Sequence, residues 1–160
     1  MKKTVVIGLG NPILTDDGVG IKVAQALRDE LGSNNSIEIK ELYAGGIRLI
    51  DAMTGYEKAV IVDAMVTGKR SPGTICSVSG TELESARNIA STHDINFSTA
   101  LEMGRMLGFQ MPGDIKIFGI EAEEVERFGE TLTDDVARAV PQVIRLIIED
   151  LSLRKDGAVL

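Results

Sequence analysis

Two aspartates and one histidine are the residues of this 160-residue chain whose types and positions best suit metal chemistry. Asp17 follows a glycine-rich turn after the first apolar run, Asp63 directly follows a later apolar run, and His93 is the only histidine. Ligands of open α/β sheets bind beyond the carboxyl ends of the strands, so neighbouring strands would place both carboxylates on one rim. Two carboxylates and an imidazole suit a divalent first-row metal and leave positions open for an external ligand.

Each of these residues also has a structural interpretation. Asp17 could cap a helix, Asp63 could accept hydrogen bonds in a turn, and a loop histidine is often simply solvated. Either of the adjacent acids Asp16 and Asp17 could alternatively serve as a general base, because paired acids often differ in pKa. The residue types alone leave these alternatives open.

Two other chemistries fit the sequence less well. Gly8 and Gly10 follow an apolar run, but Ile13 occupies the position of the third glycine in the dinucleotide-binding fingerprint, which argues against a nucleotide-binding regulator. Cys76 could act as a nucleophile with His93, but its place within an apolar run favours burial. A single cysteine also excludes an intrachain disulfide and a thiolate zinc site built within the chain.

The segments that must position these residues alternate between strands and helices. Apolar runs predict five strands, at residues 4–7, 37–42, 59–62, 74–78 and 114–120. The connection after Asp63 is short for a parallel crossover, so the fourth strand is expected to return antiparallel. The sequence therefore predicts an α/β three-layer sandwich, in which helices cover both faces of a five-stranded, mostly parallel, twisted sheet with one antiparallel strand.

Length and charge bound the domain organisation and the partners. The length favours a single α/β domain over residues 1–153, followed by a tail, 154–160, that is expected to fray. The net charge of −7 argues against nucleic-acid and anionic-membrane partners, because phosphate binding needs a basic face. No apolar stretch is long enough for a signal-peptide core or a membrane span, so we expect a cytoplasmic protein, with a monomer as the default.

Several motifs of the chain resemble those of the [NiFe]-hydrogenase maturation endopeptidases. The similarity rests on Gly8-Leu9-Gly10-Asn11-Pro12 followed by Asp16-Asp17-Gly18-Val19-Gly20, on Val60-Ile61-Val62-Asp63-Ala64, on Pro72-Gly73-Thr74, and on Thr92-His93. These motifs fall in the family's order and at about its spacings, so the resemblance covers nearly the whole chain. It implies an endopeptidase that removes a short carboxy-terminal extension from the hydrogenase large-subunit precursor after nickel has been inserted.

The resemblance also implies roles for particular residues. The family's metal-contacting residues correspond to Asp17, Asp63 and His93, which would recognise nickel held by the substrate and take part in catalysis. No resident cofactor is implied, and Cd²⁺ or Zn²⁺ is expected to occupy the same residues in vitro. Substrate-binding positions are expected at Gly8, Gly10 and Asn11, in the loop that holds Asp17, and at Tyr43, Gly45 and Gly46, where many members carry an Asp-Gly-Gly stretch. A non-enzymatic nickel-binding assembly factor that docks on the precursor is the alternative function, because it would need the same three ligands.

Overall fold

A computed structural model describes residues 3–43, 45–79 and 97–157. In this part of the chain five strands form one sheet in the order β2-β1-β3-β5-β4. The strands are β1 (Thr4–Leu9), β2 (Ile37–Leu42), β3 (Lys58–Met65), β4 (Ile75–Ser79) and β5 (Asp114–Glu121). Strands β2, β1, β3 and β5 run parallel to one another, and β4 pairs with β5 in the antiparallel direction. The predicted sheet, including its antiparallel strand, is confirmed.

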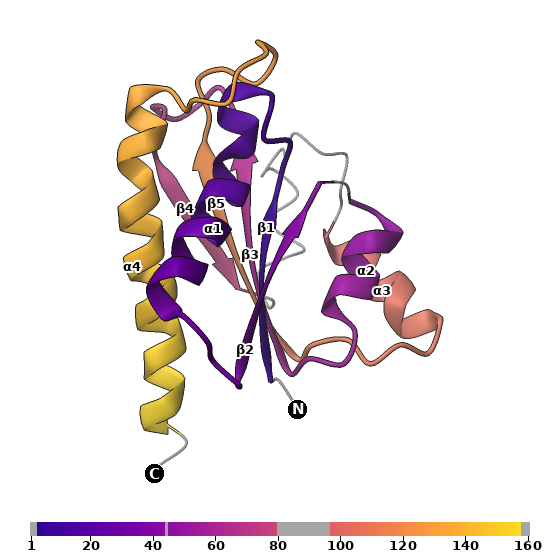
Figure 1. Ribbon diagram of the computed structural model, residues 1–160. Helices are drawn as coiled ribbons and strands as arrows, with labels where there is room; N and C mark the ends of the chain where they lie inside the picture. Colours follow the sequence, from indigo (N-terminus) through magenta and orange to yellow (C-terminus); the bar gives the residue numbers. More distant parts are fainter. Residues whose placement is uncertain (1–2, 44, 80–96, 158–160) are drawn as a thin grey trace.

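Helices cover both faces of the sheet (Figure 1). Helices α1 (Val19–Leu31) and α4 (Asp134–Gly157) pack on one face, whereas α2 (Ile47–Met53) and α3 (Phe97–Met106) pack on the other. Successive residues of each strand alternate between the two cores, so Val60 belongs to the first and Ile61 to the second. The predicted three-layer arrangement is therefore confirmed.

Helix α4 is amphipathic, with one side on the sheet and the other exposed. Val136, Val143 and Ile147 are fully buried in the core that α4 shares with α1, whereas Leu146 is exposed. Apolar residues at this helical spacing explain why the segment folds as a helix against the sheet. Within the described ranges, no helix combines the length and the apolar character that a membrane crossing requires.

Two strands are longer than predicted from their apolar runs. Strand β1 continues to Leu9, and β3 spans Lys58–Met65. Asp63 therefore lies within β3, opposite Gly119 of β5, and does not directly follow the strand as predicted. The hydrogen bonds between strands are made by backbone groups, whatever the side chain. Pairing with β5 therefore extends β3 beyond Asp63 to Met65. Asp63 still lies near the carboxyl end of the parallel strands.

The start of α1 packs directly on the end of β1. A Cβ atom on Gly8 would lie 2.2 Å from the carbonyl oxygen of Gly20, and one on Gly20 would lie 2.4 Å from the carbonyl oxygens of Leu9 and Val62. A side chain at either glycine would therefore push the helix away from the sheet. This contact fixes the short 3₁₀ helix η1 (Thr15–Gly18), which precedes α1, beyond the end of β1.

Candidate active site

The two predicted carboxylate ligands occupy the same end of the sheet. Strands β1 and β3 are parallel neighbours, with Gly8 opposite Val62. Asp17 lies in η1, beyond the end of β1, and Asp63 lies near the end of β3. Both residues are 3% exposed. The neighbouring strands that the metal-site hypothesis required are thus present, and they position two of its three residues.

The third predicted ligand, His93, lies outside the described residues. Within the part of the chain that the structure describes, no group of three or more His, Cys, Asp or Glu residues is arranged to hold a metal ion. The described residues thus contribute two carboxylates, and the three-ligand site remains a prediction that depends on His93.

Asp17 is held by the loop that precedes it. Its Oδ2 atom accepts a hydrogen bond of 3.0 Å from the backbone N–H of Asn11. The Oδ1 atom of Asn11 in turn accepts the backbone N–H of Ile13 at 3.2 Å, which closes a local turn. A Cβ atom on Gly10 would lie 2.0 Å from the carbonyl oxygen of Asp17. Gly8, Gly10 and Asn11 therefore shape the loop around Asp17, while their predicted contact with substrate stays a prediction.

Asp16 has a different environment from its neighbour. It is fully buried, and its carboxylate accepts the backbone N–H groups of Glu123 at 2.9 Å, Glu124 at 3.0 Å and Thr133 at 2.8 Å. It also accepts the hydroxyl of Thr133 at 2.8 Å. Four hydrogen bonds to the connection between β5 and α4 favour a structural role for Asp16 over the general-base role that its position alone allowed.

Thr15 fastens the same connection to η1. Its backbone has φ +54°, a conformation that non-glycine residues seldom adopt, and its side chain is buried. The backbone N–H of Thr15 donates to the carbonyl oxygen of Gly129 at 2.9 Å, and its hydroxyl donates to that of Arg127 at 2.5 Å. The backbone N–H of Gly129 donates to the carbonyl oxygen of Ile13 at 2.9 Å. These bonds hold the strained residue in place, and with it the two acids that follow.

The second group of predicted substrate-binding residues lies after β2. Tyr43 follows the last residue of that strand and is 58% exposed. Gly46 precedes the first residue of α2 with φ +68°, and a Cβ atom there would meet nothing within 4 Å. Gly45 is partly buried between them. This short segment therefore borders solvent at the carboxyl end of β2, where a substrate could reach it.

Sequence reasoning missed another buried acid at this end of the sheet. Glu121, the last residue of β5, is 2% exposed and pairs with Met65 of β3. It accepts the backbone N–H of Thr67 at 2.9 Å and the hydroxyl of the same residue. The same sequence pattern that predicted Asp63 as a candidate, an acid at the end of an apolar run, also applies to Glu121. The buried acids Asp16, Asp17, Asp63 and Glu121 thus concentrate negative charge here, which favours a cationic ligand.

The geometry argues against the dinucleotide interpretation, whereas the pairing of Cys76 with His93 falls outside the described residues. The position that a dinucleotide's pyrophosphate would need, at the turn after β1, is next to the buried carboxylates of Asp16 and Asp17, which would repel it. Cys76 is partly buried in β4 and its sulfur lies against the guanidinium of Arg70.

Comparisons with known proteins agree on one family. The family model described as hydrogenase maturation protease matches residues 21–150 of this chain. The hydrogenase 2 maturation protease of Escherichia coli K12 is 27% identical over 151 residues, which cover 92% of this chain and 92% of that protein.

Solved structures give the same result. The hydrogenase maturating endopeptidase HybD from E. coli superposes with a TM-score of 0.79 at 26% identity, covering 97% of this chain and 94% of that one. The [NiFe] hydrogenase maturation protease HybD from Thermococcus kodakarensis superposes with a TM-score of 0.73 at 27% identity, covering 93% and 98%. Sequence and fold thus match these proteins over nearly their whole length.

Proposed function

Because this chain belongs to the hydrogenase maturation protease family, we propose that it removes the carboxy-terminal extension of a [NiFe]-hydrogenase large-subunit precursor and recognises the nickel that the precursor carries. The chain is an endopeptidase of that family. The observation that best supports the nickel-dependent part is the pair of buried carboxylates at one end of the sheet, Asp17 in η1 beyond β1 and Asp63 in the neighbouring parallel strand β3. In this proposal the metal is part of the substrate, and the enzyme supplies ligands to it.

The buried carboxylates suit this recognition for an electrostatic reason. Burial in a low-dielectric rim strengthens the attraction between a carboxylate and an incoming cation. A precursor that carries nickel would therefore bind better than one without it. With His93 as a third ligand, enzyme and substrate would share one ion, and the shared ion would fix the position of the scissile peptide relative to the enzyme.

The reaction itself is peptide hydrolysis. A water molecule adds to the scissile carbonyl carbon, the C–N bond breaks, and the leaving amine takes up a proton. Asp17, Asp63 and His93 are the proposed participants, and the ion could polarise the carbonyl or the attacking water. We do not assign Asp16 to this group, because its carboxylate already accepts four hydrogen bonds from the connection between β5 and α4.

We further propose that the enzyme acts in the cytoplasm as a monomer with no resident metal. Metal analysis of the protein purified without added nickel would then find less than one equivalent of any transition metal. Added Zn²⁺ or Cd²⁺ would bind in competition with Ni²⁺, and light scattering would give the mass of one chain. A tightly held stoichiometric metal would contradict the idea that the ion arrives with the substrate.

Intact-mass spectrometry of the large-subunit precursor, with and without nickel, tests the proposed reaction. Incubation of the nickel-loaded precursor with this protein is expected to produce a fragment shortened at its carboxyl terminus. An unchanged mass would instead favour a nickel-binding assembly factor that docks without cutting. Equal cleavage of the nickel-free precursor would retain the protease and contradict nickel recognition.

A further inference from the structure

Strand β2 forms one edge of the sheet, and half of its backbone faces away from β1. The carbonyl oxygens of Ser36 and Leu42 accept hydrogen bonds from Thr4 at 3.1 Å and Gly10 at 3.0 Å, so the even-numbered positions face β1. In a parallel ladder the backbone groups of alternate residues point to opposite sides. The N–H and C=O groups of Ile39 and Glu41 therefore point away from the sheet, toward a potential added strand.

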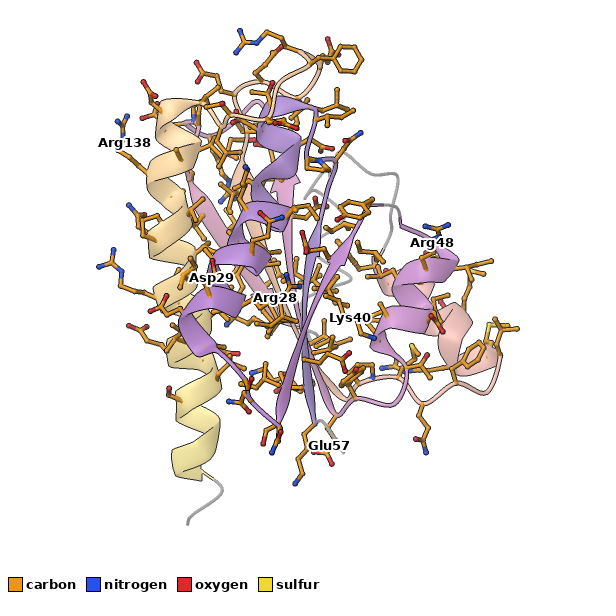
Figure 2. All side chains as sticks on the ribbon, viewed as in Figure 1. Arg28, Asp29, Lys40, Arg48, Glu57 and Arg138 are labelled. Carbon is orange, nitrogen blue, oxygen red and sulfur yellow. The ribbon has the colours of Figure 1, made fainter. Side chains whose placement is uncertain are left out.

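This edge lies in a groove of about 550 Å³ between α1 and α2. The groove is lined by residues of β2 and the residue after it, by Arg28 of α1 and by Arg48, Asp51 and Ala52 of α2. Figure 2 shows Arg28 on one side of β2, and Lys40 and Arg48 on the side toward α2. The volume falls within the range of ligand-binding clefts and suits a few residues of extended peptide.

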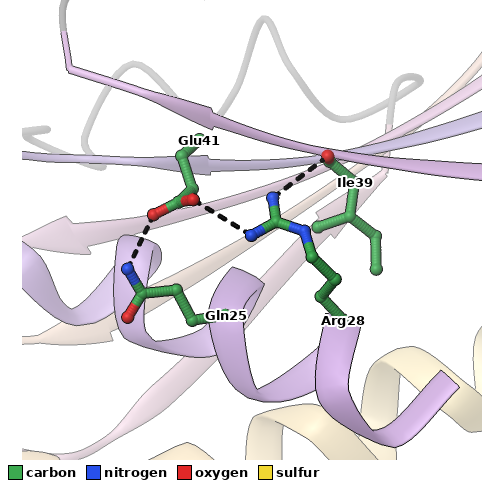
Figure 3. A network of polar contacts seen from close by, with 4 residues as sticks. All are labelled: Gln25, Arg28, Ile39 and Glu41. Carbon is green, nitrogen blue, oxygen red and sulfur yellow. Dashed lines mark hydrogen bonds and ion pairs between the residues drawn. The ribbon is translucent and has the colours of Figure 1, made fainter. Parts of the chain in front are cut away.

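Part of the edge is already covered by a side chain from α1 (Figure 3). Arg28 donates to the carbonyl oxygen of Ile39 at 3.3 Å and to the carboxylate of Glu41 at 3.1 Å. Gln25 donates to the same carboxylate at 2.8 Å. A charged side chain over an exposed strand is a common protection against unwanted pairing. Arg28 occupies the outward-facing carbonyl group of Ile39. The outward-facing N–H and C=O groups of Glu41, which lie closer to the carboxyl end of the sheet, are then the ones that an added strand would pair with.

The charges of the groove favour an acidic occupant. Its cationic side chains are Arg28, Lys40 and Arg48, and its acids are Glu41 and Asp51. Glu41 is already engaged by Arg28. Lys40 donates to the carbonyl oxygen of Ala52 at 3.3 Å and lies over the ring of Tyr56, and neither contact cancels its charge. Arg48 is exposed and, among the residues that the structure describes, makes no ion pair. The rest of the groove therefore presents an excess of positive charge in a chain whose net charge is −7.

The groove leads directly to the candidate active site. The hydrogen bond from Gly10 to Leu42 joins the end of β2 to the loop whose next residue, Asn11, holds the carboxylate of Asp17. A chain that lay along Glu41 and continued past Tyr43 would therefore reach the rim that carries Asp17 and Asp63. A polypeptide substrate must be extended where it is cut, and an open strand edge is a general means of binding extended chains.

We propose that an extended, acidic segment of the large-subunit precursor adds as a strand to the Glu41 end of β2, with its carboxylates facing Arg48 and Lys40. This inference rests on the proposed function, since it takes the precursor as the substrate. The added strand aligns the precursor chain with the rim, while the nickel contacts fix the scissile peptide. The groove is thus a substrate-positioning surface, and its loss raises KM more than it lowers kcat.

A pair of substitutions at one position isolates the backbone contribution. Both Glu41→Pro and Glu41→Gln remove the ion pair with Arg28, but only proline removes the outward N–H group. Proline is tolerated on an edge strand where its nitrogen faces away from the neighbouring strand. We expect Glu41→Pro to raise KM about tenfold relative to Glu41→Gln, with kcat changed less than about twofold. Equal KM values for two folded variants would overturn strand addition.

A second pair tests the charge contribution and does not touch the sheet. Arg48→Glu reverses the exposed cation of the groove, and Arg145→Glu makes the same change on the exposed side of α4, which packs on the opposite face of the sheet. We expect Arg48→Glu alone to raise KM, by about fivefold or more at low salt, with the difference shrinking as ionic strength rises. An equal effect of both substitutions would contradict an acidic segment in the groove.

The outcomes separate this inference from the proposed function. If the wild-type protein does not shorten the nickel-loaded precursor, the proposed function fails, whatever the variants do. If the wild type cleaves, and neither Glu41→Pro nor Arg48→Glu changes KM relative to its control, the groove inference fails alone. Should Glu41→Pro not fold, the comparison of Arg48→Glu with Arg145→Glu decides.

Discussion

The two ends of the parallel sheet differ in how buried charged residues are compensated: by ion pairs at the amino end and by hydrogen bonds at the carboxyl end. At the amino end Lys58 is 2% exposed and forms ion pairs with Asp150 of α4 and, at 3.8 Å, with Asp114 of β5. At the carboxyl end lie the four buried acids Asp16, Asp17, Asp63 and Glu121. Asp16 and Glu121 accept backbone N–H groups and threonine hydroxyls, which stabilise a carboxylate without cancelling its charge.

The difference separates a structural contact from a candidate site. An ion pair such as Lys58–Asp150 joins α4 to the sheet and presents little net charge to a ligand. Backbone donors satisfy a carboxylate without bringing a positive charge, so the carboxyl end presents an excess of acids to a cation. The two adjacent acids differ in the same way. The carboxylate of Asp16 accepts four hydrogen bonds from the connection between β5 and α4. We therefore expect Asp17, and not Asp16, to contact the substrate.

The largest effect is expected for the acids that we assign to nickel. Asp17→Asn and Asp63→Asn should each lower the rate of precursor cleavage by about a thousandfold, because a neutral amide is a weak ligand for the cation. Both variants should retain the fold by circular dichroism. Near-normal cleavage by either variant would remove that residue from the site.

A smaller effect, on stability, is expected for Asp16. Asp16→Ala leaves three backbone N–H groups without their acceptor, so it should lower the free energy of unfolding by roughly 3 kcal/mol. Asp16→Asn retains one acceptor oxygen and should cost less. Urea denaturation measures both. A stable Asp16→Ala variant without activity would show that Asp16 belongs to the chemistry after all.

Sequence reasoning succeeded where local patterns decide the structure. Apolar runs located each strand of the described ranges, and the short connection before Thr74 indicated the antiparallel one. Sequence reasoning failed where contacts between distant segments determine the role of a residue. The hydrogen bond from Thr133 to Asp16 joins residues 117 positions apart, and no local pattern around Asp16 predicts it. Similarly, the pattern placed Asp63 after its strand, because the pairing that extends β3 comes from β5.

At the amino end we expect a moderate effect on stability and none on chemistry. Lys58→Met leaves Asp150 without its buried partner and should cost about 2 kcal/mol of unfolding free energy. Adding Asp150→Leu should recover most of that loss, since an apolar pair needs no compensation. The rate of cleavage per folded molecule should stay at the wild-type value in both variants. A large fall in that rate would contradict a purely structural role for the amino-end ion pair.

The smallest effect concerns Tyr56, on the α2 side of the edge strand β2. Burial, a hydrogen bond to Glu38 and the negative charge of that residue raise the pKa of Tyr56 from 10.0 to about 12. The folded protein therefore holds the phenol proton more tightly than the unfolded chain does. The protonated Tyr56 phenol therefore contributes to the free energy of unfolding. This stabilisation is fully present below pH 10 and is lost as the pH rises to about 12.

Two measurements check that assignment. Tyr56→Phe should flatten the loss of stability over this pH window relative to wild type. In a Tyr43→Phe background, absorbance of the remaining tyrosinate should titrate above its usual range. An ordinary tyrosine titration would contradict the pairing with Glu38.

The most direct test of the central claim is the affinity of the enzyme for nickel-loaded and nickel-free precursor, measured by surface plasmon resonance for wild type, Asp17→Asn and Lys58→Met. We predict that wild type and Lys58→Met bind the nickel-loaded precursor at least about tenfold more tightly than the nickel-free form. We predict that Asp17→Asn loses this preference and retains its affinity for the nickel-free form. An undiminished preference in Asp17→Asn would contradict the assignment of the buried carboxyl-end acids to nickel recognition.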